Sequence, residues 1–144
     1  MNVFDVARYI LSSIGGEISA MKLQKLCYYS QAWTLAWDGK ELFPEDFLRW
    51  DNGPVCRELF DVHQGMFMVN RDVIDKKLLS NNLPMDLQEN IDKVLEDYGQ
   101  YSGSELSEMT HREKPWAETP RNKVITKECM RKYYSNQIKN NVEE

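Results

Sequence analysis

The feature that most constrains the fold is an uncharged stretch, residues 26–37 (LCYYSQAWTLAW), which lies between Lys25 and Asp38. At about 100° per residue, its apolar side chains reach almost every side of a helix. Only a narrow polar strip remains, formed by Gln24, Gln31 and Thr34. A helix that is apolar on most sides is buried on most sides. Because a membrane span needs about 20 consecutive apolar residues and this run is shorter, we predict a core helix of a soluble protein.

Local signals set the boundaries of this central helix. Ser19 can cap its first turn and Gly39 can end it, which places the helix at residues 19–38. The remaining helix-like patterns bring the total to about six. These other helices end at Gly15, open at Pro54, end at Gly99, follow a capping box at Ser102, and follow Thr126.

Little β structure is expected. One short extended piece is plausible at Phe47–Trp50, because a strong turn signal, Asp51-Asn52-Gly53, follows it. Residues 66–82 show no clear period. We therefore predict a mainly α fold: one compact domain over residues 1–139, built around the central helix, with a tail at residues 140–144 that frays.

The composition limits the classes of function. A chain of 144 residues that is 42% hydrophobic and 28% charged can form one domain with a real core. The net charge of −5 argues against general nucleic-acid binding. The three cysteines are far apart and form no pair at metal-ligand spacing, so we expect free thiols in the cytoplasm. The basic segment 121–139 could bind an acidic partner, or it could be a solvated helix face.

The candidates for catalysis are weakly specified. His111 and Glu113 form the only His-x-Glu pair, and on a continuous helix their side chains would point apart. They could act as an acid/base pair only if the helix ends between them. The simpler expectation is that His111 bonds to nearby backbone and Glu113 caps a helix or forms an ion pair. No phosphate-binding glycine loop, nucleophile motif or metal-ligand spacing is present in the sequence.

Two lysines stand in the first turn of the central helix, where positive charge opposes the helix dipole. Lys22 and Lys25 could pair with Glu17 or another surface carboxylate, or they could face a partner. Trp50 and Trp116 adjoin turn residues, where tryptophans serve as lids of a core or as interface anchors.

Four phrases, in order along the chain, carry a resemblance to a known family. They are residues 21–26 with 28–33 (MKLQKL and YYSQAW), Gly53-Pro54-Val55 after Trp50, residues 106–111 (LSEMTH), and Glu113-Lys114-Pro115-Trp116. The chain resembles the Panacea domain family of SocA-like antitoxins and phage-associated GepA-type proteins. The similarity covers residues 19–116 and extends more loosely to Tyr134, and the His-x-x-x-Pro-Trp ending of the family is intact. Cys27 stands where the family usually has an aliphatic residue.

The resemblance implies an antitoxin that binds and neutralises a toxin encoded by a neighbouring gene, often in a prophage or another mobile genetic element. It implies a protein partner, establishes no catalytic activity or cofactor, and leaves the toxin and the oligomeric state open. We expect no membrane association, and the net charge argues against a nucleic-acid partner. Two alternatives remain: a small enzyme that uses His111 and Glu113, and a DNA-binding phage regulator.

The family phrases end at three element boundaries: a helix start, a turn and a helix end. Because such boundaries expose unpaired backbone groups, we expect them to converge on one partner-binding face. Its members would be Lys22, Gln24, Lys25, Trp50, Asn52, Gly53, Pro54, His111, Glu113, Pro115 and Trp116. In the alternative, the two tryptophans close the core and the polar groups hold the turns in place.

Overall fold

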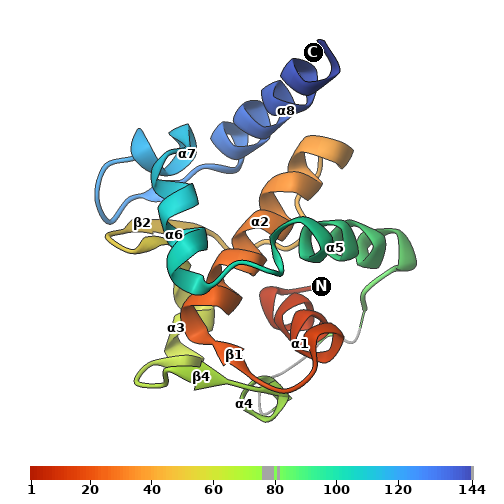
Figure 1. The fold of residues 1–144 in the computed structure, drawn as a ribbon, viewed down its shortest axis with the longest axis vertical. Coiled ribbons are helices and arrows are strands. Elements are labelled where there is room, and N and C mark those ends of the chain that lie inside the picture. Colours follow the sequence, from red (N-terminus) through yellow and green to blue (C-terminus); the bar gives the residue numbers. More distant parts are fainter. Residues whose placement is uncertain (76–79, 81, 144) are drawn as a thin grey trace.

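The structure is a computed structural model that describes residues 1–75, 80 and 82–143. Within this part the chain forms eight helices (Figure 1). They are α1 (Val3–Ile14), α2 (Ala20–Asp38), α3 (Arg57–His63), α4 (Arg71–Asp75), α5 (Met85–Tyr98), α6 (Gly103–His111), α7 (Lys114–Ala117) and α8 (Lys127–Glu143). The prediction of a mainly α fold is confirmed, but the number of helices is larger than about six, since α4 and α7 are single turns that no sequence period marks. None of the described helices combines the length and the apolar character that a membrane crossing needs.

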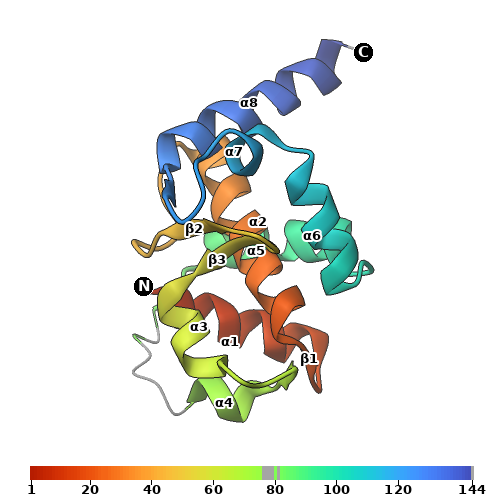
Figure 2. The same ribbon diagram turned by 90° about the vertical axis from the view of Figure 1, so that its left-hand side faces the viewer.

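The β structure is larger than the single short piece expected. β1 (Ile18–Ser19) pairs with β4 (Met68–Val69), and β2 (Phe47–Trp50) pairs with β3 (Gly53–Cys56) and β5 (Val124–Ile125), all antiparallel. β4 and α4 lie in the segment that showed no period, and residues 76–79 and 81 of that segment lie outside the described residues. Figure 2 shows β2 and β3 on one side of the molecule, above α3 and α4.

The prediction that Pro54 opens a helix is wrong. Gly53 has a φ of 113° and turns the chain back along β2, so that Pro54 lies opposite Arg49 and Cys56 opposite Phe47. The helix begins only at Arg57, after this pairing ends. A Gly-Pro pair suits a turn that continues as a strand as well as a helix start, and the strand partner decided between them.

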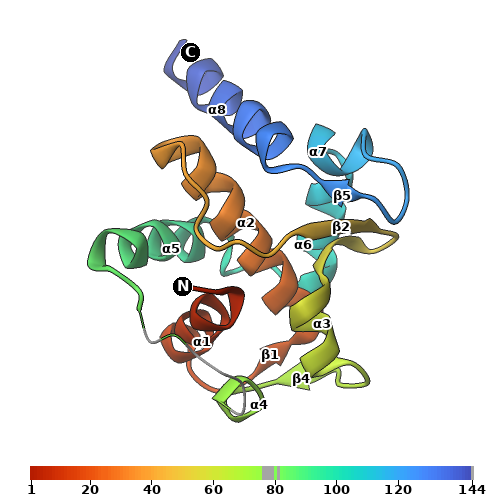
Figure 3. The ribbon, with the colours of Figure 1, turned by 180° about the vertical axis from the view of Figure 1, so that it is seen from behind.

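The long helix α2 begins and ends at the predicted residues. Ser19 Oγ accepts a hydrogen bond from the Lys22 amide at 3.0 Å, and Gly39 ends the helix in the left-handed conformation. Leu26 and Leu35 are buried, in agreement with a helix that is apolar on most sides, whereas Trp33 is only half-buried. The helix packs against α1, α5, α6, α8 and β3. Figure 3 shows it passing between these elements, with α1 and α5 on one side and the β2–β3 hairpin on the other.

The polar strip of α2 does not face solvent. Gln31 is fully buried; its Nε2 donates to the Phe43 carbonyl at 2.7 Å, and its Oε1 accepts from the Leu42 amide at 2.7 Å. Gln24 is bound in the same way to both backbone groups of Cys56. The two glutamine side chains therefore satisfy backbone N–H and C=O groups of the segment between α2 and α3. In this way they attach that segment to α2.

The C-terminal helix α8 packs along α2, and its far end projects beyond the rest of the molecule (Figures 1 and 3). Tyr134 anchors it: the side chain is buried and its ring contacts Tyr28, Tyr29 and Trp33. We expected residues 140–144 to fray. The helical backbone runs to Glu143, and Glu144 lies outside the described residues.

Candidate functional site

The start of α2, the β2–β3 turn and the end of α6 lie against one another. A Cβ atom built on Gly53 would lie 2.6 Å from Lys25 Cε and 3.0 Å from Thr110 Oγ1, so a larger residue would displace Lys25, and the φ of 113° favours glycine in addition. Ser107 Oγ of α6 donates a hydrogen bond to the Asn52 carbonyl. Trp116 Nε1 of α7 donates to the Trp50 carbonyl at 2.8 Å. These contacts join segments that are far apart in the sequence into one region.

Lys25 is the most unusual residue of this region. Its side chain is only 1% exposed, and its ammonium has no hydrogen bond or ion pair with any described residue. Burial lowers the pKa of Lys25 to about 7, because the apolar surroundings disfavour the charged form. Lys22 lies about one helical turn before Lys25 on α2, and its Nζ donates a hydrogen bond to the Gly99 carbonyl at 2.6 Å. Neither lysine pairs with Glu17 or another carboxylate in the described part of the chain.

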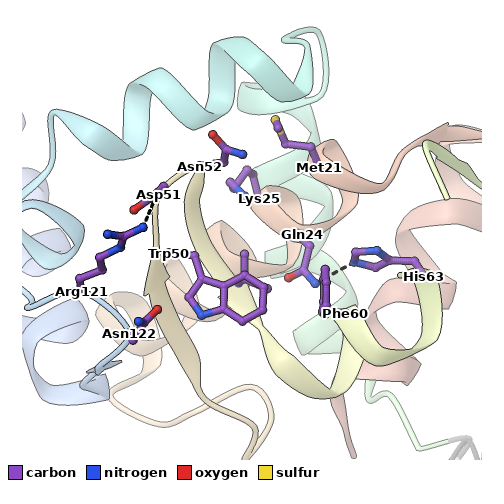
Figure 4. Close-up of a pocket in the computed structure, with 11 residues that line it drawn as sticks. Met21, Gln24, Lys25, Trp50, Asp51, Asn52, Phe60, His63, Arg121 and Asn122 are labelled. Atoms are coloured by element: carbon purple, nitrogen blue, oxygen red, sulfur yellow. Dashed lines mark hydrogen bonds and ion pairs between the residues drawn. The ribbon is translucent and has the colours of Figure 1, made fainter. Parts of the chain in front are cut away.

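A cavity of about 420 Å³ opens beside Lys25 (Figure 4). It lies between α2, α3, the β2–β3 hairpin and the loop before β5. Its floor is buried, and its rim is formed by exposed side chains from the turn and the loop. The lining residues are Met21, Gln24, Lys25, Trp50, Asp51, Asn52, Val55, Phe60, His63, Arg121 and Asn122.

The polar groups on the cavity floor have defined protonation. Gln24 Nε2 lies 2.9 Å from His63 Nε2 and 3.2 Å from the Cys56 carbonyl, while Gln24 Oε1 accepts from the Cys56 amide. The amide is thereby oriented as a donor to His63, so His63 Nε2 is an acceptor and the ring is neutral. Burial lowers the pKa of His63, and the positive charge of Lys25 lowers it further.

Aromatic rings and an ion pair form the rim. Trp50 and Phe60 meet edge to face with ring centroids 4.9 Å apart, and the Phe60 ring lies 5.5 Å from His63. Arg121 Nη2 lies 2.7 Å from Asp51 Oδ2, as the dashed line in Figure 4 marks. Arg49 Nη1 lies 3.7 Å from the other oxygen of the same carboxylate. The charge of Asp51 is therefore balanced at the rim by arginine.

The His-x-x-x-Pro-Trp phrase, His111 to Trp116, forms a stack of side chains beside the β2–β3 hairpin. The His111 and Trp116 rings have centroids 4.1 Å apart, and the Arg49 guanidinium carbon lies 3.6 Å from the Trp116 ring centroid. Two buried nitrogens of this stack, Arg49 Nε and His111 Nε2, have no hydrogen-bond partner among the described residues. Through its bond to Trp50, Trp116 connects the stack to the cavity rim.

The geometry does not support an acid/base pair of His111 and Glu113. Glu113 Oε1 accepts from the Tyr29 hydroxyl at 2.8 Å and from the Tyr134 hydroxyl at 2.9 Å, so the carboxylate points into the tyrosine cluster. Burial raises the pKa of Glu113, and these two hydrogen bonds oppose the rise. His111 packs on Trp116 instead. Among the described residues, no hydrogen bond or ion pair joins His111 to Glu113.

The structure thus separates the predicted binding residues into groups. Gln24, Lys25, Trp50 and Asn52 line the cavity, and Gly53 touches Lys25. Pro54 and Pro115 are buried, and His111 and Trp116 lie in the adjoining stack. The remaining two point elsewhere: Lys22 to Gly99, and Glu113 to the tyrosines. Whether any of these residues bind a partner stays a prediction.

Several cavity residues carry no signal in the sequence that would place them at a common site. Met21, Phe60, His63 and Arg121 line the cavity, although three of them come from segments that carry no family phrase. His63 gave a faint signal, as one of only two histidines in the chain and the last residue of a short apolar-striped segment. No local pattern shows that α3 and the loop before β5 face the same space.

The comparisons with known proteins agree with the resemblance found in the four phrases. A family model described as antitoxin SocA-like, Panacea domain, matches residues 23–117. The match begins in α2 and ends with α7, and so includes Lys25, the β2–β3 turn, His111 and Trp116. Comparison with curated proteins and with solved structures gave no match. The matched segment makes up more than half of the chain, and the protein therefore belongs to the SocA-like antitoxin family defined by the Panacea domain.

Proposed function

We propose that this protein is the antitoxin of a toxin–antitoxin system and that it neutralises the toxin of a neighbouring gene by direct binding in the cytoplasm. The observation that carries the proposal is the family match over residues 23–117, which indicates an antitoxin-like role and a protein partner. A genetic location in a prophage or another mobile element is part of the proposal.

An exposed apolar patch supports a protein partner. Phe67 is 81% exposed, and its neighbours Met66 and Met68 are 45% and 39% exposed. The patch lies at the start of α2, because the Phe67 carbonyl accepts a hydrogen bond from the Ala20 amide at 2.8 Å. Met21, the next residue of α2, lines the cavity. Exposed aromatic and methionine side chains are typical of protein interfaces, so this patch and the cavity rim are the surface that we assign to the toxin.

The chemistry of the described residues favours binding over catalysis. The predicted acid and base are separated, as described above, and the three cysteines are free thiols, two of them buried. A reduced thiol set is compatible with the proposed cytoplasmic location.

Growth assays test the proposal. Each neighbouring gene is expressed alone and together with this protein, and the mixture is then purified for measurement of complex formation. The expected result is one neighbour that arrests growth alone, is harmless in the presence of this protein, and co-elutes with it as a stoichiometric complex. If no neighbouring product is toxic, or if protection occurs without a complex, direct neutralisation is wrong.

A further inference from the structure

We propose that the cavity beside Lys25 binds a carboxylate group of the toxin and that the buried Lys25 ammonium is its counter-charge. That the carboxylate belongs to a toxin rests on the proposed function. That the cavity binds a carboxylate rests on the cavity alone.

The first reason is the state of the ammonium. Lys25 is 1% exposed, carries three donors, and uses none of them on a described residue. A buried charge without a partner is among the most costly groups in a folded protein, and native structures nearly always pair it. No described carboxylate forms an ion pair with Lys25, and Asp51, the carboxylate that lines the cavity rim, is bound by Arg121 and Arg49.

The second reason is the position of the side chain. The β2–β3 turn presses on its end: a Cβ atom on Gly53 would meet Lys25 Cε at 2.6 Å and Nζ at 3.4 Å. Thr110 Oγ1 would lie 3.0 Å from the same Cβ atom, and the Thr110 hydroxyl donates to the Ser107 carbonyl at 2.6 Å. Figure 4 shows the lysine end between Met21, Asn52 and Trp50, at the edge of the open space.

The third reason is the chemistry of the walls. Met21, Trp50, Val55 and Phe60 make the cavity largely apolar, so an ion pair inside it would be stronger than at the surface. Its volume of about 420 Å³ lies within the roughly 300–1,000 Å³ usual for ligand sites. A carboxylate also suits the amide side chain of Asn52 at the rim, which can donate to its second oxygen.

The charge balance selects a carboxylate over a phosphate. In its protonated form Lys25 supplies one positive charge, which matches one negative charge. A dianionic phosphate would leave a second charge in an apolar cavity near Asp51, which desolvation disfavours. The other titratable groups around the cavity add no free positive charge on the floor, because His63 is neutral and Arg121 is bound to Asp51 at the rim.

Peptide probes test the inference without the toxin. The probes are the capped peptide amides Gly-Glu-Gly and Gly-Gln-Gly, a capped triglycine with a free C-terminal carboxylate, acetate, and inorganic phosphate. The purified protein carries isotope-labelled lysine, and binding is followed by the NMR signals of the Lys25 side chain at pH 7. Lys25→Met removes the ammonium, and Lys132→Met, at an exposed position of α8, is the matched control.

We expect at least one carboxylate peptide to bind about tenfold more tightly than Gly-Gln-Gly and to raise the pKa of Lys25, because an opposite charge stabilises the ammonium. Lys25→Met abolishes this preference and Lys132→Met retains it. The glutamate peptide and the free C-terminus distinguish a side chain from a chain end as the source. Lys25→Gln repeats the measurement if Lys25→Met does not fold.

Three results would overturn the inference. Equal binding of the glutamate and glutamine peptides with no response to the free C-terminus excludes a carboxylate site. Binding of acetate alone excludes a protein carboxylate, and tighter binding of phosphate excludes the charge argument. Since no probe contains the toxin, failure here leaves the growth assay unaffected, and failure of the growth assay leaves a carboxylate site with another source.

Discussion

At the scale of single residues, Lys25 works against the stability of the fold. Burial lowers its pKa from 10.5 to about 7, so the folded protein holds this proton less tightly than the unfolded chain does. Each pKa unit corresponds to about 1.4 kcal/mol, and Lys25 therefore destabilises the protein by several times that amount while it is charged in the unfolded state. A residue that costs stability and lines a cavity is a candidate for binding rather than for folding.

Replacement of Lys25 by methionine should increase the free energy of unfolding, since methionine has a similar shape and no charge. Between pH 7 and pH 10.5 the unfolded chain binds more protons at this position than the folded protein does, so the stability of the unsubstituted protein rises with pH across this window. The gain from Lys25→Met is therefore largest at and below pH 7 and disappears near pH 10.5. Urea unfolding at several pH values measures it. A loss of stability at pH 7 would mean that Lys25 has a partner in the folded protein.

At the scale of elements, the β2–β3 turn depends on close approach. Gly53 has a φ of 113°, and its missing side chain leaves room for Lys25 and Thr110. The same turn holds α6 through the Asn52 carbonyl and α7 through the Trp50 carbonyl. One glycine thus determines how closely three elements meet at the cavity.

Substitution of Gly53 by alanine should lower the free energy of unfolding by about 1–3 kcal/mol, the usual cost of a strained backbone, and by more if Lys25 cannot move. Gly65 is the matched control, because it has a φ of 86° and nothing within 4 Å of a built Cβ. Gly65→Ala should therefore lower the free energy of unfolding only through backbone strain, with no contribution from a steric clash. When Lys25 is also replaced by alanine, Gly53→Ala should lower the free energy of unfolding by less, because the lysine end that the new Cβ would meet is absent. Equal penalties at both glycines would show that the contact with Lys25 is unimportant.

The packing of α2 gives a prediction at the same scale. Leu26 is fully buried, and its helix contacts most of the other elements. Leu26→Ala should cost roughly 2–5 kcal/mol, the usual range for a buried leucine. Ile14, at the end of α1, is 38% exposed, and Ile14→Ala should cost much less. A loss below about 1 kcal/mol for Leu26→Ala, measured by urea unfolding, would place α2 at the periphery of the core.

At the scale of the whole molecule, one end of α2 gathers the features that we assign to binding. The patch of Met66, Phe67 and Met68 adjoins Ala20, and Met21 and Lys25 line the cavity on the next turn. The middle of α2 is covered by the contacts of Tyr28 and Tyr29 with Tyr134 of α8. The arrangement separates a surface for a partner from the aromatic packing that holds the C-terminal helix.

Phe67→Ser should weaken protection against the toxin, with about tenfold weaker binding of the complex, and leave the melting temperature nearly unchanged because Phe67 is 81% exposed. Met85→Ser is the matched control: Met85 is 69% exposed at the start of α5, outside the patch. Binding is measured by calorimetry with the purified toxin. If both substitutions weaken binding equally, or neither does, the patch is not the interface.

The sequence by itself determined the features that depend on neighbours in the chain. The uncharged run with Ser19 and Gly39 predicted α2 to within a residue, and the capping box at Ser102 predicted the start of α6, because caps and periodicity act within a few residues. The four family phrases predicted the family, and the three boundaries that they mark lie against one another.

Only the tertiary structure decided which polar residues are buried and what they meet. The sequence places Gln24 in a polar strip and lets Lys25 pair with a surface carboxylate or face a partner. Both side chains are buried, because β3 and α3 cover that end of the helix. The Gly53-Pro54 pair predicted a helix start at Pro54, but pairing with β2 makes Pro54 part of strand β3. His63 reaches the cavity from a helix that shares no local pattern with α2. Burial and pairing depend on contacts between distant segments, and a local pattern carries no information about the distant partner.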